Sequence, residues 1–355
     1  MEYIKDKSID LMVTSPPYPM IEMWDEIFSE QNPEIKTALA NKHGNRAFEL
    51  MHKELDKVWN EVFRVLKNGG FACINIGDAT RKLDDRFRLY SNHSRILQHC
   101  IEIGFEPMPE ILWRKQTNAP NKFMGSGMLP AGAYVTLEHE FILMLRKDGK
   151  RNFKTEEDKL NRQKSAYFWE ERNNWFSDVW EGLKGTRQNH IDKAIRERSG
   201  AYPFELAYRL INMFSVRGDT VLDPFLGTGT TTIASMVAGR NSIGIEIDKN
   251  FRNSIIQRID TAIDTSKEQI ENRLKNHLEF MKQRSTLKGE PKYTNSVYGF
   301  PVMTRQELEL TLDEIETIEK VENEITVTYK MQPTTIYRNN EIVTKNKSSL
   351  HNWVS

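Results

Sequence analysis

A serine, two prolines and a tyrosine stand in a row, Ser15-Pro16-Pro17-Tyr18, directly after an apolar run at 9–13 that predicts a buried strand. Two successive prolines fix φ and keep the residues before them extended, so that backbone carbonyls point outward. Two acceptors at these positions, the Ser15 hydroxyl and the Pro16 carbonyl, can hold both N–H groups of an amine and favour a pyramidal nitrogen that can attack an electrophile. The motif therefore suits a loop that holds an amine; the alternative is a Pro-Pro turn that only ends a strand.

A glycine-rich stretch lies far downstream, where a predicted strand at 220–223 runs into Asp223-Pro224-Phe225-Leu226-Gly227-Thr228-Gly229-Thr230. A strand, a glycine-rich turn and a helix place backbone N–H groups at a helix N-terminus, where they can bind an anion. Gly227 and Gly229 let a ligand approach closely, and the threonines at 230–232 can cap the helix. Glu246 follows at the end of the next predicted strand, where it can accept hydrogen bonds from ribose hydroxyls. This spacing predicts a cofactor that contains a nucleoside.

Several other reaction classes fit these residues less well. The third glycine of the dinucleotide fingerprint is absent because Thr232 occupies its place, and no Gly-Lys-Thr/Ser follows for a nucleoside triphosphate. A thiolate nucleophile in a Pro-Cys setting is not indicated, because neither Cys73 nor Cys100 follows a proline. A nicotinamide-dependent oxidoreductase stays an alternative on the glycine loop alone.

The two motifs together resemble those of the amino-directed DNA methyltransferases. The wording Asp-Pro-Phe-x-Gly-x-Gly is similar to the first motif of that family, and the order, catalytic loop first and cofactor loop last, resembles its beta class. Serine in the first position of the catalytic motif is the pattern of the cytosine-N4 enzymes, whereas adenine-N6 enzymes usually carry Asp or Asn there. The resemblance covers residues 8–260. It implies a site-specific enzyme that moves a methyl group from S-adenosylmethionine to cytosine N4 in double-stranded DNA, as the protective half of a restriction–modification pair.

The resemblance also implies a role for each motif residue. Tyr18 would stack on the extruded base, because a base inside a duplex cannot reach the cofactor. The carboxylate of the cofactor's methionine end would meet the loop N–H groups, its ammonium would meet Asp223, and the segment 202–205 would close over that end. The implied catalytic residues are Ser15, Pro16, Pro17 and Tyr18, and the implied cofactor-binding residues are Asp223, Pro224, Phe225, Gly227, Thr228, Gly229, Thr230, Glu246, Tyr202 and Pro203.

Further segments resemble later parts of the family, and one expected part is missing. The matching segments are 66–70, 111–115, 138–141 and, as in the C-terminal extensions of some cytosine-N4 enzymes, 298–304. Relatives usually carry another strand just upstream of 6–10, with an acid that reads the cofactor's adenine amine, and this chain begins too late to contain it. Either other groups hold the adenine, the C-terminal element fills in, or the chain is shorter than the full gene product.

Strands alternate with helices along most of the chain. Apolar runs predict strands at 9–13, 71–76, 109–114, 137–145, 220–223 and 242–246, and helical spacing predicts helices at 48–66 (stopped by Gly69-Gly70), 92–103, 203–214, 228–238 and 249–284. This alternation predicts an α/β fold, a Rossmann-like, mostly parallel sheet with helices on both faces. The resemblance implies that the order is a circular permutation of the methyltransferase fold. The predicted divisions are 1–146 for the catalytic half, 147–200 for an aperiodic target-recognition insertion, 201–262 for the cofactor half and 263–355 for a C-terminal α+β extension.

Charge and composition limit the possible partners. Lysine plus arginine and aspartate plus glutamate number 50 each, so any DNA-binding face must come from local imbalance, such as the basic run 184–198. DNA reading would fall to 115–136 and 147–200. His139 and His190 are interpreted as structural, and no spacing predicts a metal site. No run is long enough to span a bilayer and no signal peptide is evident, which together with two unpaired cysteines predicts a cytoplasmic protein.

Three alternatives stay open at this point. The target could be adenine N6, or the chain could be a DNA-binding protein on the same scaffold without catalysis, or an oxidoreductase. The resemblance also allows a cognate restriction endonuclease that acts on the same site. The oligomeric state and the recognition sequence are not encoded in any pattern found.

Overall fold

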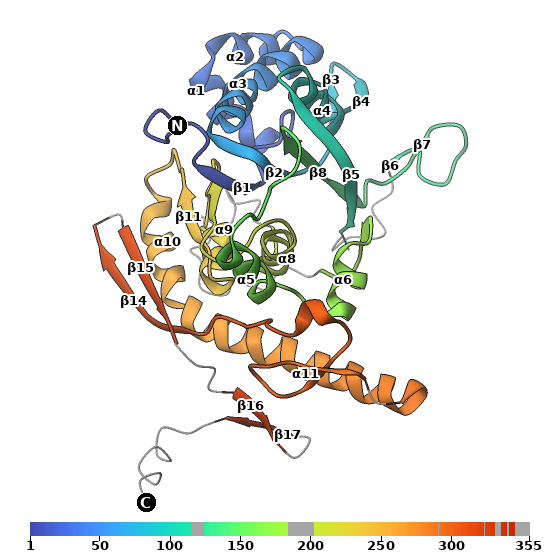
Figure 1. The fold of residues 1–355 in the computed structure, drawn as a ribbon. Helices are drawn as coiled ribbons and strands as arrows, with labels where there is room; N and C mark the ends of the chain where they lie inside the picture. Colours follow the sequence, from blue (N-terminus) through green and yellow to red (C-terminus); the bar gives the residue numbers. More distant parts are fainter. Residues whose placement is uncertain are drawn as a thin grey trace, which may run out of the picture.

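The computed structural model describes residues 1–115, 124–183, 202–289, 291–322, 324–330, 335–338 and 341–344. Its centre is a seven-stranded sheet in the order β11-β10-β1-β2-β8-β5-β9 (Figure 1). The strands β11, β10, β1 and β2 run parallel, β8 is antiparallel to both β2 and β5, and β9 is parallel to β5. Their bounds are β11 Asn241–Gly244, β10 Thr220–Asp223, β1 Ile9–Thr14, β2 Leu66–Ile76, β8 His139–Lys147, β5 Phe105–Arg114 and β9 Val179–Trp180.

Helices cover both faces of this sheet because its strands alternate their apolar side chains between two cores. Met12 of β1 and Ile74 of β2 pack in one core, and Val13 and Cys73 pack in the other. The first core is covered by α1 Asp25–Gln31, α2 Pro33–Ala40, α3 Gly44–Val65 and α4 Asn92–Glu102, and the second by α6 Trp169–Trp175, α8 Phe204–Phe214 and α9 Thr230–Val237. The predicted α/β fold class is confirmed.

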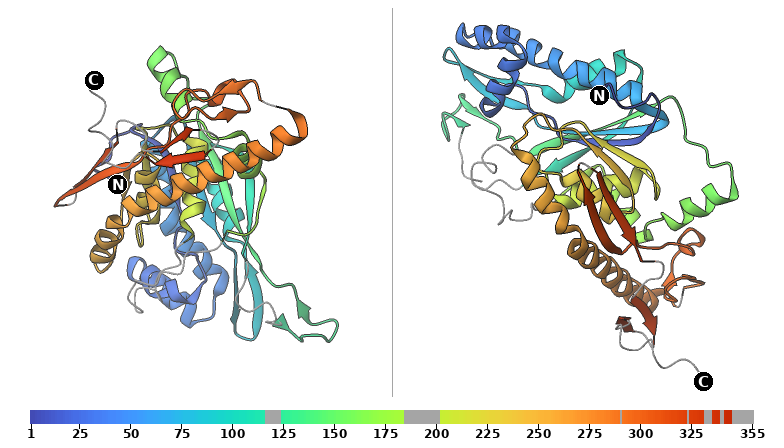
Figure 2. Two further views of the ribbon diagram at one scale, coloured as in Figure 1. Left: turned by 90° about the horizontal axis from the view of Figure 1, so that it is seen from below. Right: turned by 90° about the vertical axis from the view of Figure 1, so that its left-hand side faces the viewer.

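The C-terminal part packs against the second face as an α+β extension. It contains α10 Phe251–Asp260, the long helix α11 Ala262–Lys288, and three hairpins with strands β12 Tyr293–Thr294, β13 Pro301–Val302, β14 Ile315–Val321, β15 Glu324–Tyr329, β16 Thr335–Arg338 and β17 Glu341–Thr344. Helix α11 lies on the side of the molecule opposite to α1–α3 (Figures 1 and 2). A third core joins it to the domain, with Phe168, Leu274 and Phe300 among its buried residues.

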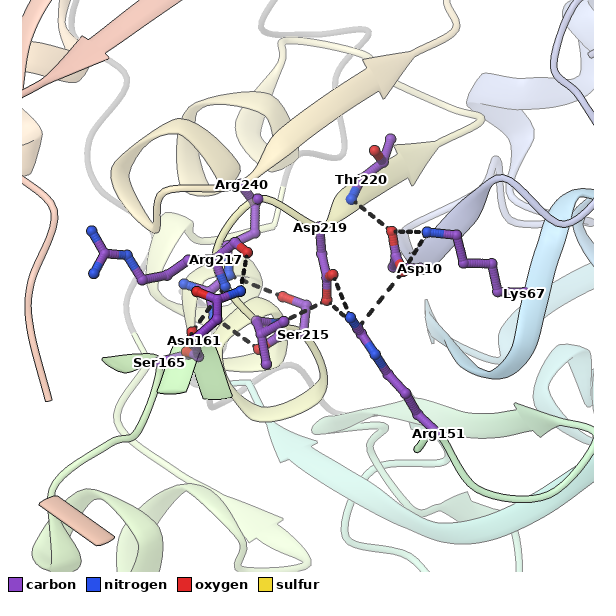
Figure 3. A network of polar contacts seen from close by, with 12 residues as sticks. Asp10, Lys67, Arg151, Asn161, Ser165, Ser215, Arg217, Asp219, Thr220 and Arg240 are labelled. Atoms are coloured by element: carbon purple, nitrogen blue, oxygen red, sulfur yellow. Dashed lines mark hydrogen bonds and ion pairs between the residues drawn. The ribbon is translucent and has the colours of Figure 1, made fainter. Parts of the chain in front are cut away.

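Buried charges hold the amino-terminal ends of the central strands in register (Figure 3). Asp10 of β1 accepts from Lys67 Nζ of β2 at 2.7 Å and from the Thr220 backbone N–H of β10 at 3.0 Å. Arg151 Nη2 donates to Asp219 Oδ1 at 2.9 Å, and its Nη1 lies 3.7 Å from Asp10. Because three neighbouring strands are tied at one end, their carboxyl ends are fixed relative to each other at the other end.

Two expectations about local structure were wrong. Helix α3 ends at Val65, one residue before the predicted end, but Gly69 and Gly70 do not stop it, because β2 begins at Leu66 and contains both glycines. A Cβ on Gly70 would come within 2.8 Å of the Asp10 backbone oxygen, so the glycine allows close strand contact and does not end the helix. The segment predicted to be aperiodic contains α5 Glu156–Lys164, α6 and the edge strand β9. Trp175 and Trp180 are buried in the second core there, since aromatic burial does not need helical periodicity.

The segments predicted to read DNA are only partly described by the structure. The segments 116–123 and 184–201, with the basic run and His190, lie outside the described residues. Within the described residues, the loop predicted to read DNA forms the hairpin β6 Met124–Gly125 and β7 Ala133–Tyr134, whose Tyr134 stacks on Phe87 of the hairpin β3 Ala79–Leu83 and β4 Arg86–Tyr90. The two hairpins project together from the domain (Figure 2). His139 is exposed, with its ring edge on Phe141.

The edge of the sheet at β11 bears on the alternative that the C-terminal element fills in for an upstream strand. Among the described strands β11 pairs only with β10, and Ile243 is 38% exposed there. The hairpin β14–β15 forms a separate two-stranded sheet and does not pair with β11. Within the described residues, the C-terminal element therefore does not fill in by pairing a strand with β11. No helix in the described part of the chain combines the length and apolarity needed to cross a bilayer. The divisions at 146, 200 and 262 stay predictions.

Candidate functional site

The two sequence motifs meet at the carboxyl ends of two adjacent strands. Thr14 is the last residue of β1 and Asp223 the last of β10, and these strands pair in parallel. Thr14 Oγ1 donates to Asp223 Oδ1 at 2.5 Å, although the two residues are 209 positions apart in the chain. Two loops start from these touching residues, because Ser15 follows Thr14 and Pro224 follows Asp223. The loop 15–18 is called the amine-binding loop after its predicted role, and the loop 224–230 is called the glycine loop. In open α/β sheets this edge is where ligands bind.

Asp223 is the centre of the glycine-loop half of the site. Its carboxylate also accepts from Thr231 Oγ1 at 2.6 Å and from the Phe225 backbone N–H at 3.1 Å. The side chain is only 2% exposed, and burial raises its pKa to about 6 even though three hydrogen bonds favour the charged form. This carboxylate is buried, its pKa is raised, and it has no cationic partner among the described residues. A positively charged ligand group would therefore bind here with a large gain in electrostatic free energy.

Tyr202 lies beside this carboxylate, as the sequence predicted. Its hydroxyl is hydrogen-bonded to Thr231, and burial together with the charge of Asp223 raises its pKa well above the usual range. Pro203 is buried and stands at the N-cap of α8. The segment 202–203 therefore closes one side of the site, next to the last residue of β10.

The glycine loop has the backbone conformation that its sequence requires. Gly227 and Gly229 have φ values of +52° and +80°, and Gly229 is the N-cap residue of α9. A Cβ at Gly227 would meet nothing closer than the Phe225 oxygen at 3.9 Å, so the space above it is open. Glu246 Oε2 accepts from the Gly227 N–H at 2.7 Å, and burial raises the pKa of Glu246. Two carboxylates therefore border an open glycine turn, which suits a cofactor with a cationic end and ribose hydroxyls.

Four other predicted cofactor residues support the loop from inside. Pro224 is buried, and the ring of Phe225 packs edge-on against Trp59, 5.9 Å between centroids, in the first core. Arg258 of α10 donates to the Thr228 backbone oxygen at 2.7 Å and also contacts the hydroxyls of Thr228 and Thr230. Arg258 was not predicted from the sequence, because nothing there distinguishes it from the other basic residues of the predicted helical region 249–284.

The amine-binding loop is held by three polar residues that sequence reasoning also missed. The Tyr18 hydroxyl donates to Glu140 Oε2 at 2.9 Å and lies 3.2 Å from Ser15 Oγ. Asn75 Nδ2, from the end of β2, is 2.9 Å from the Tyr18 oxygen and 2.7 Å from Glu140 Oε2. Lys115 contacts the other Glu140 oxygen. Burial, and then the charge of Glu140, raises the pKa of Tyr18 well above the usual range.

The remaining residues predicted to be catalytic lie in the same loop as Ser15. Pro16 is buried and Pro17 is half-buried, directly beyond the end of β1. Tyr18 is half-buried with its ring edge against Gly77, where a Cβ would come within 2.9 Å of Tyr18 Cε2. The loop predicted to hold an amine and the open glycine turn predicted to hold a nucleoside cofactor thus lie at adjacent strand ends, the arrangement expected of an enzyme that transfers a group to an amine.

Comparison with known proteins agrees with this geometry. The sequence model of the DNA methylase family matches residues 9–258, and the chain belongs to that family of N6/N4 amino-methyltransferases. Type II methyltransferase M.MthZI of Methanothermobacter thermautotrophicus is 54% identical over 324 residues, covering 91% of this chain and 90% of the relative. Type II methyltransferase M.MjaI of Methanocaldococcus jannaschii is 51% identical over 270 residues, covering 73% and 88%.

A solved structure has the same fold. The protein TTHA0409 of Thermus thermophilus, assigned as a DNA modification methylase and solved with S-adenosyl-L-methionine, superposes with a TM-score of 0.57 at 31% identity, covering 74% of this chain and 90% of that one. The family predicted from the two motifs is confirmed. The oxidoreductase alternative falls away with it.

Proposed function

We propose that this protein is a site-specific DNA methyltransferase that moves a methyl group from S-adenosylmethionine to the exocyclic N4 of a flipped cytosine in double-stranded DNA. The coarser part of this statement, an S-adenosylmethionine-dependent DNA methyltransferase of the N6/N4 family, rests on the family match and on the relatives. The choice of cytosine N4 is supported by Ser15, because the adenine-N6 enzymes that this chain resembles usually carry Asp or Asn there.

The contact between Thr14 and Asp223 is the observation that carries the proposal. It joins the loop that would hold the base amine to the loop that would hold the methyl donor. S-adenosylmethionine, when bound, supplies a methyl group on a sulfonium. Asp223 would hold its ammonium, Glu246 its ribose, and Tyr202 would exclude water from that end. Fixing donor and amine at adjacent strand ends would favour transfer through positioning.

The base half of the site would work through hydrogen bonds to the amine. Ser15 Oγ and the Pro16 carbonyl would accept from the two N–H groups and leave the nitrogen lone pair facing the methyl group. Tyr18 would lie against the extruded base. Serine is neutral, so it accepts one N–H without removing a proton, which suits an amine that loses its proton only after it has gained the methyl group.

The target base is tested by digesting methylated DNA to nucleosides and identifying the modified nucleoside by mass spectrometry. N4-methylcytosine is the expected product, and N6-methyladenine would overturn the choice of base while keeping the enzyme class. Transfer of a tritiated methyl group to mixed-sequence DNA tests catalysis itself: DNA binding without incorporation would instead support a non-catalytic DNA-binding protein.

We also propose that the protein protects DNA in a restriction–modification system, since the relatives above carry the name type II methyltransferase. DNA from a host that expresses the protein should then resist an endonuclease that cuts at the methylated sequence. Sequencing of that DNA maps the sequence, and full cleavage of the mapped, methylated sites would contradict a protective role.

A further inference from the structure

Behind the amine-binding loop lies a hydrogen-bonded cluster that the proposed function does not use. Its members outside the loop are Asn75 at the end of β2, Glu140 at the start of β8 and Lys115 just after β5. Glu140 is 7% exposed and Asn75 2%. Buried polar groups stabilise the folded protein only when each donor faces an acceptor. The direction of each hydrogen bond in the cluster can therefore be worked out.

The direction of these bonds starts from Glu140. Lys115 contacts one of its oxygens, so the group is a carboxylate beside an ammonium and can only accept. The Tyr18 hydroxyl, 2.9 Å from Glu140 Oε2, must therefore donate its proton to Glu140. Asn75 must also turn its N–H₂ toward this carboxylate, since the reverse amide orientation would set Oδ1 against Oε2 at 2.7 Å.

The Tyr18 hydroxyl links Ser15 to Glu140, so the direction of one hydrogen bond determines the direction of the other. With its proton given to Glu140, the Tyr18 oxygen can only accept. Asn75 Nδ2 donates to it at 2.9 Å, and in the bond to Ser15 Oγ, 3.2 Å away, Ser15 is the donor. Asn75 Nδ2 is 3.4 Å from Ser15 Oγ and takes at most one of its lone pairs, which leaves the other for a substrate. Asn75 Oδ1 is itself buried without a hydrogen-bond partner in the described part of the chain.

We propose that Glu140 is a positioning residue that determines the choice of a base amine over a base carbonyl, by forcing Ser15 to act as a hydrogen-bond acceptor. This inference rests on the proposed function, in which Ser15 meets the exocyclic amine. An amine brings an N–H to the free Ser15 lone pair. A keto oxygen at the same place brings another lone pair, so the contact becomes repulsive and a buried acceptor is left unpaired.

The test is the replacement Glu140→Gln, which keeps the shape and changes the bonding. The glutamine amide can donate to the Tyr18 oxygen, so the Tyr18 proton turns to Ser15 and the Ser15 proton turns to the substrate. Binding is measured by fluorescence anisotropy in saturating S-adenosylhomocysteine. The two duplexes differ only at the mapped target position, cytosine or uracil (adenine or hypoxanthine if the product is N6-methyladenine).

The ratio of the affinities for the amine-bearing and the keto duplex should be about tenfold lower in Glu140→Gln than in the wild-type protein, a comparison in which the easier extrusion of a mismatched keto base cancels. The kcat of Glu140→Gln should fall while the KM for S-adenosylmethionine is unchanged. Glu138→Gln is the matched control, because Glu138 is exposed nearby and pairs only with Arg114, 3.4 Å away, among the described residues. It should keep the wild-type ratio.

A second variant tests the route through Tyr18. Tyr18→Phe removes the hydroxyl that links Glu140 to Ser15, so it should lower the ratio as well, and adding Glu140→Gln to it should change nothing further. A wild-type ratio in Glu140→Gln despite a lower kcat would refute the proposal, as would a wild-type ratio in Tyr18→Phe if Glu140→Gln fails to fold. Absence of methyl transfer by the wild-type protein would instead refute the proposed function.

Discussion

The replacement Asp223→Asn should stabilise the protein without cofactor and weaken cofactor binding. Burial raises the pKa of Asp223 from 3.8 to about 6, so the folded state holds the proton more tightly than the unfolded state does. Stability from this group is therefore complete below pH 3.8 and is lost as the pH rises through 6. Asparagine is neutral at every pH and avoids that loss.

The size of the effect follows from the shift. About two pKa units correspond to about 3 kcal/mol of unfolding free energy at pH 8, and to about half of that at pH 5. This is an upper value, because the amide must replace one hydrogen bond. It can do so: Oδ1 can keep the bonds from Thr14 and Phe225, and the N–H₂ can donate to Thr231, whose hydroxyl is 3.3 Å from the Val13 oxygen.

Urea denaturation of both proteins at pH 8 and pH 5 measures the stability, and titration calorimetry with S-adenosylhomocysteine measures cofactor binding. We expect the variant to be more stable at pH 8, with a smaller gain at pH 5, and to bind the ligand at least about tenfold more weakly, since a charged hydrogen bond to its ammonium is lost. A variant that is less stable at both pH values would refute the linkage reasoning. Normal affinity for S-adenosylhomocysteine would refute the placement of the cofactor.

Three further replacements test other parts of the site. Tyr18→Ala should weaken DNA binding by roughly 1–3 kcal/mol, the scale of an aromatic–base contact, and leave S-adenosylhomocysteine binding unchanged in calorimetry. Gly77→Ala places a Cβ 2.9 Å from Tyr18 Cε2 and 3.3 Å from Glu140 Cγ, so it should lower kcat while the melting temperature changes little; an unchanged kcat would contradict the packing described. Arg151→Met removes the cation beside Asp219 and Asp10, so urea denaturation should show a loss of about 2 kcal/mol, with no loss of kcat at low temperature.

The site residues that end a predicted strand or directly follow one could be predicted from the sequence. A strand followed by prolines, or by a glycine turn and a helix, fixes where the chain goes, and adjacent parallel strands bring their carboxyl ends together. Ser15 and Asp223 were found in this way, and the structure joins them through Thr14. The error at 147–183 came from the opposite situation, because Trp175 and Trp180 are buried by tertiary contacts that leave no period in the sequence.

The polar groups behind the catalytic loop could not be predicted in the same way. Glu140 and Tyr18 are 122 positions apart, and β8, which carries Glu140, enters the sheet antiparallel between β2 and β5. Its first residues, rather than its last, therefore lie at the carboxyl edge of the parallel strands. The sequence pattern at 138–141 indicates a strand, but it does not show that the strand is antiparallel and brings Glu140 to this edge.

This reversal of β8 has a consequence for how the site works. Side chains that follow β1 and β10 stand on loops that must adapt to a base and a cofactor, whereas Glu140 and Asn75 lie within paired strands of the sheet. Side chains on strands are held more rigidly than those on loops, so the direction of the hydrogen bond at Ser15 is set by the fold and is present before the base arrives. Acceptors that are already in place do not have to reorient during methyl transfer, so little free energy is spent on reorganising them. The proposed selection of an amine thus joins two parts: the sheet holds Glu140 and Asn75, and the loop after β1 supplies Ser15 and the Tyr18 hydroxyl that links Ser15 to Glu140.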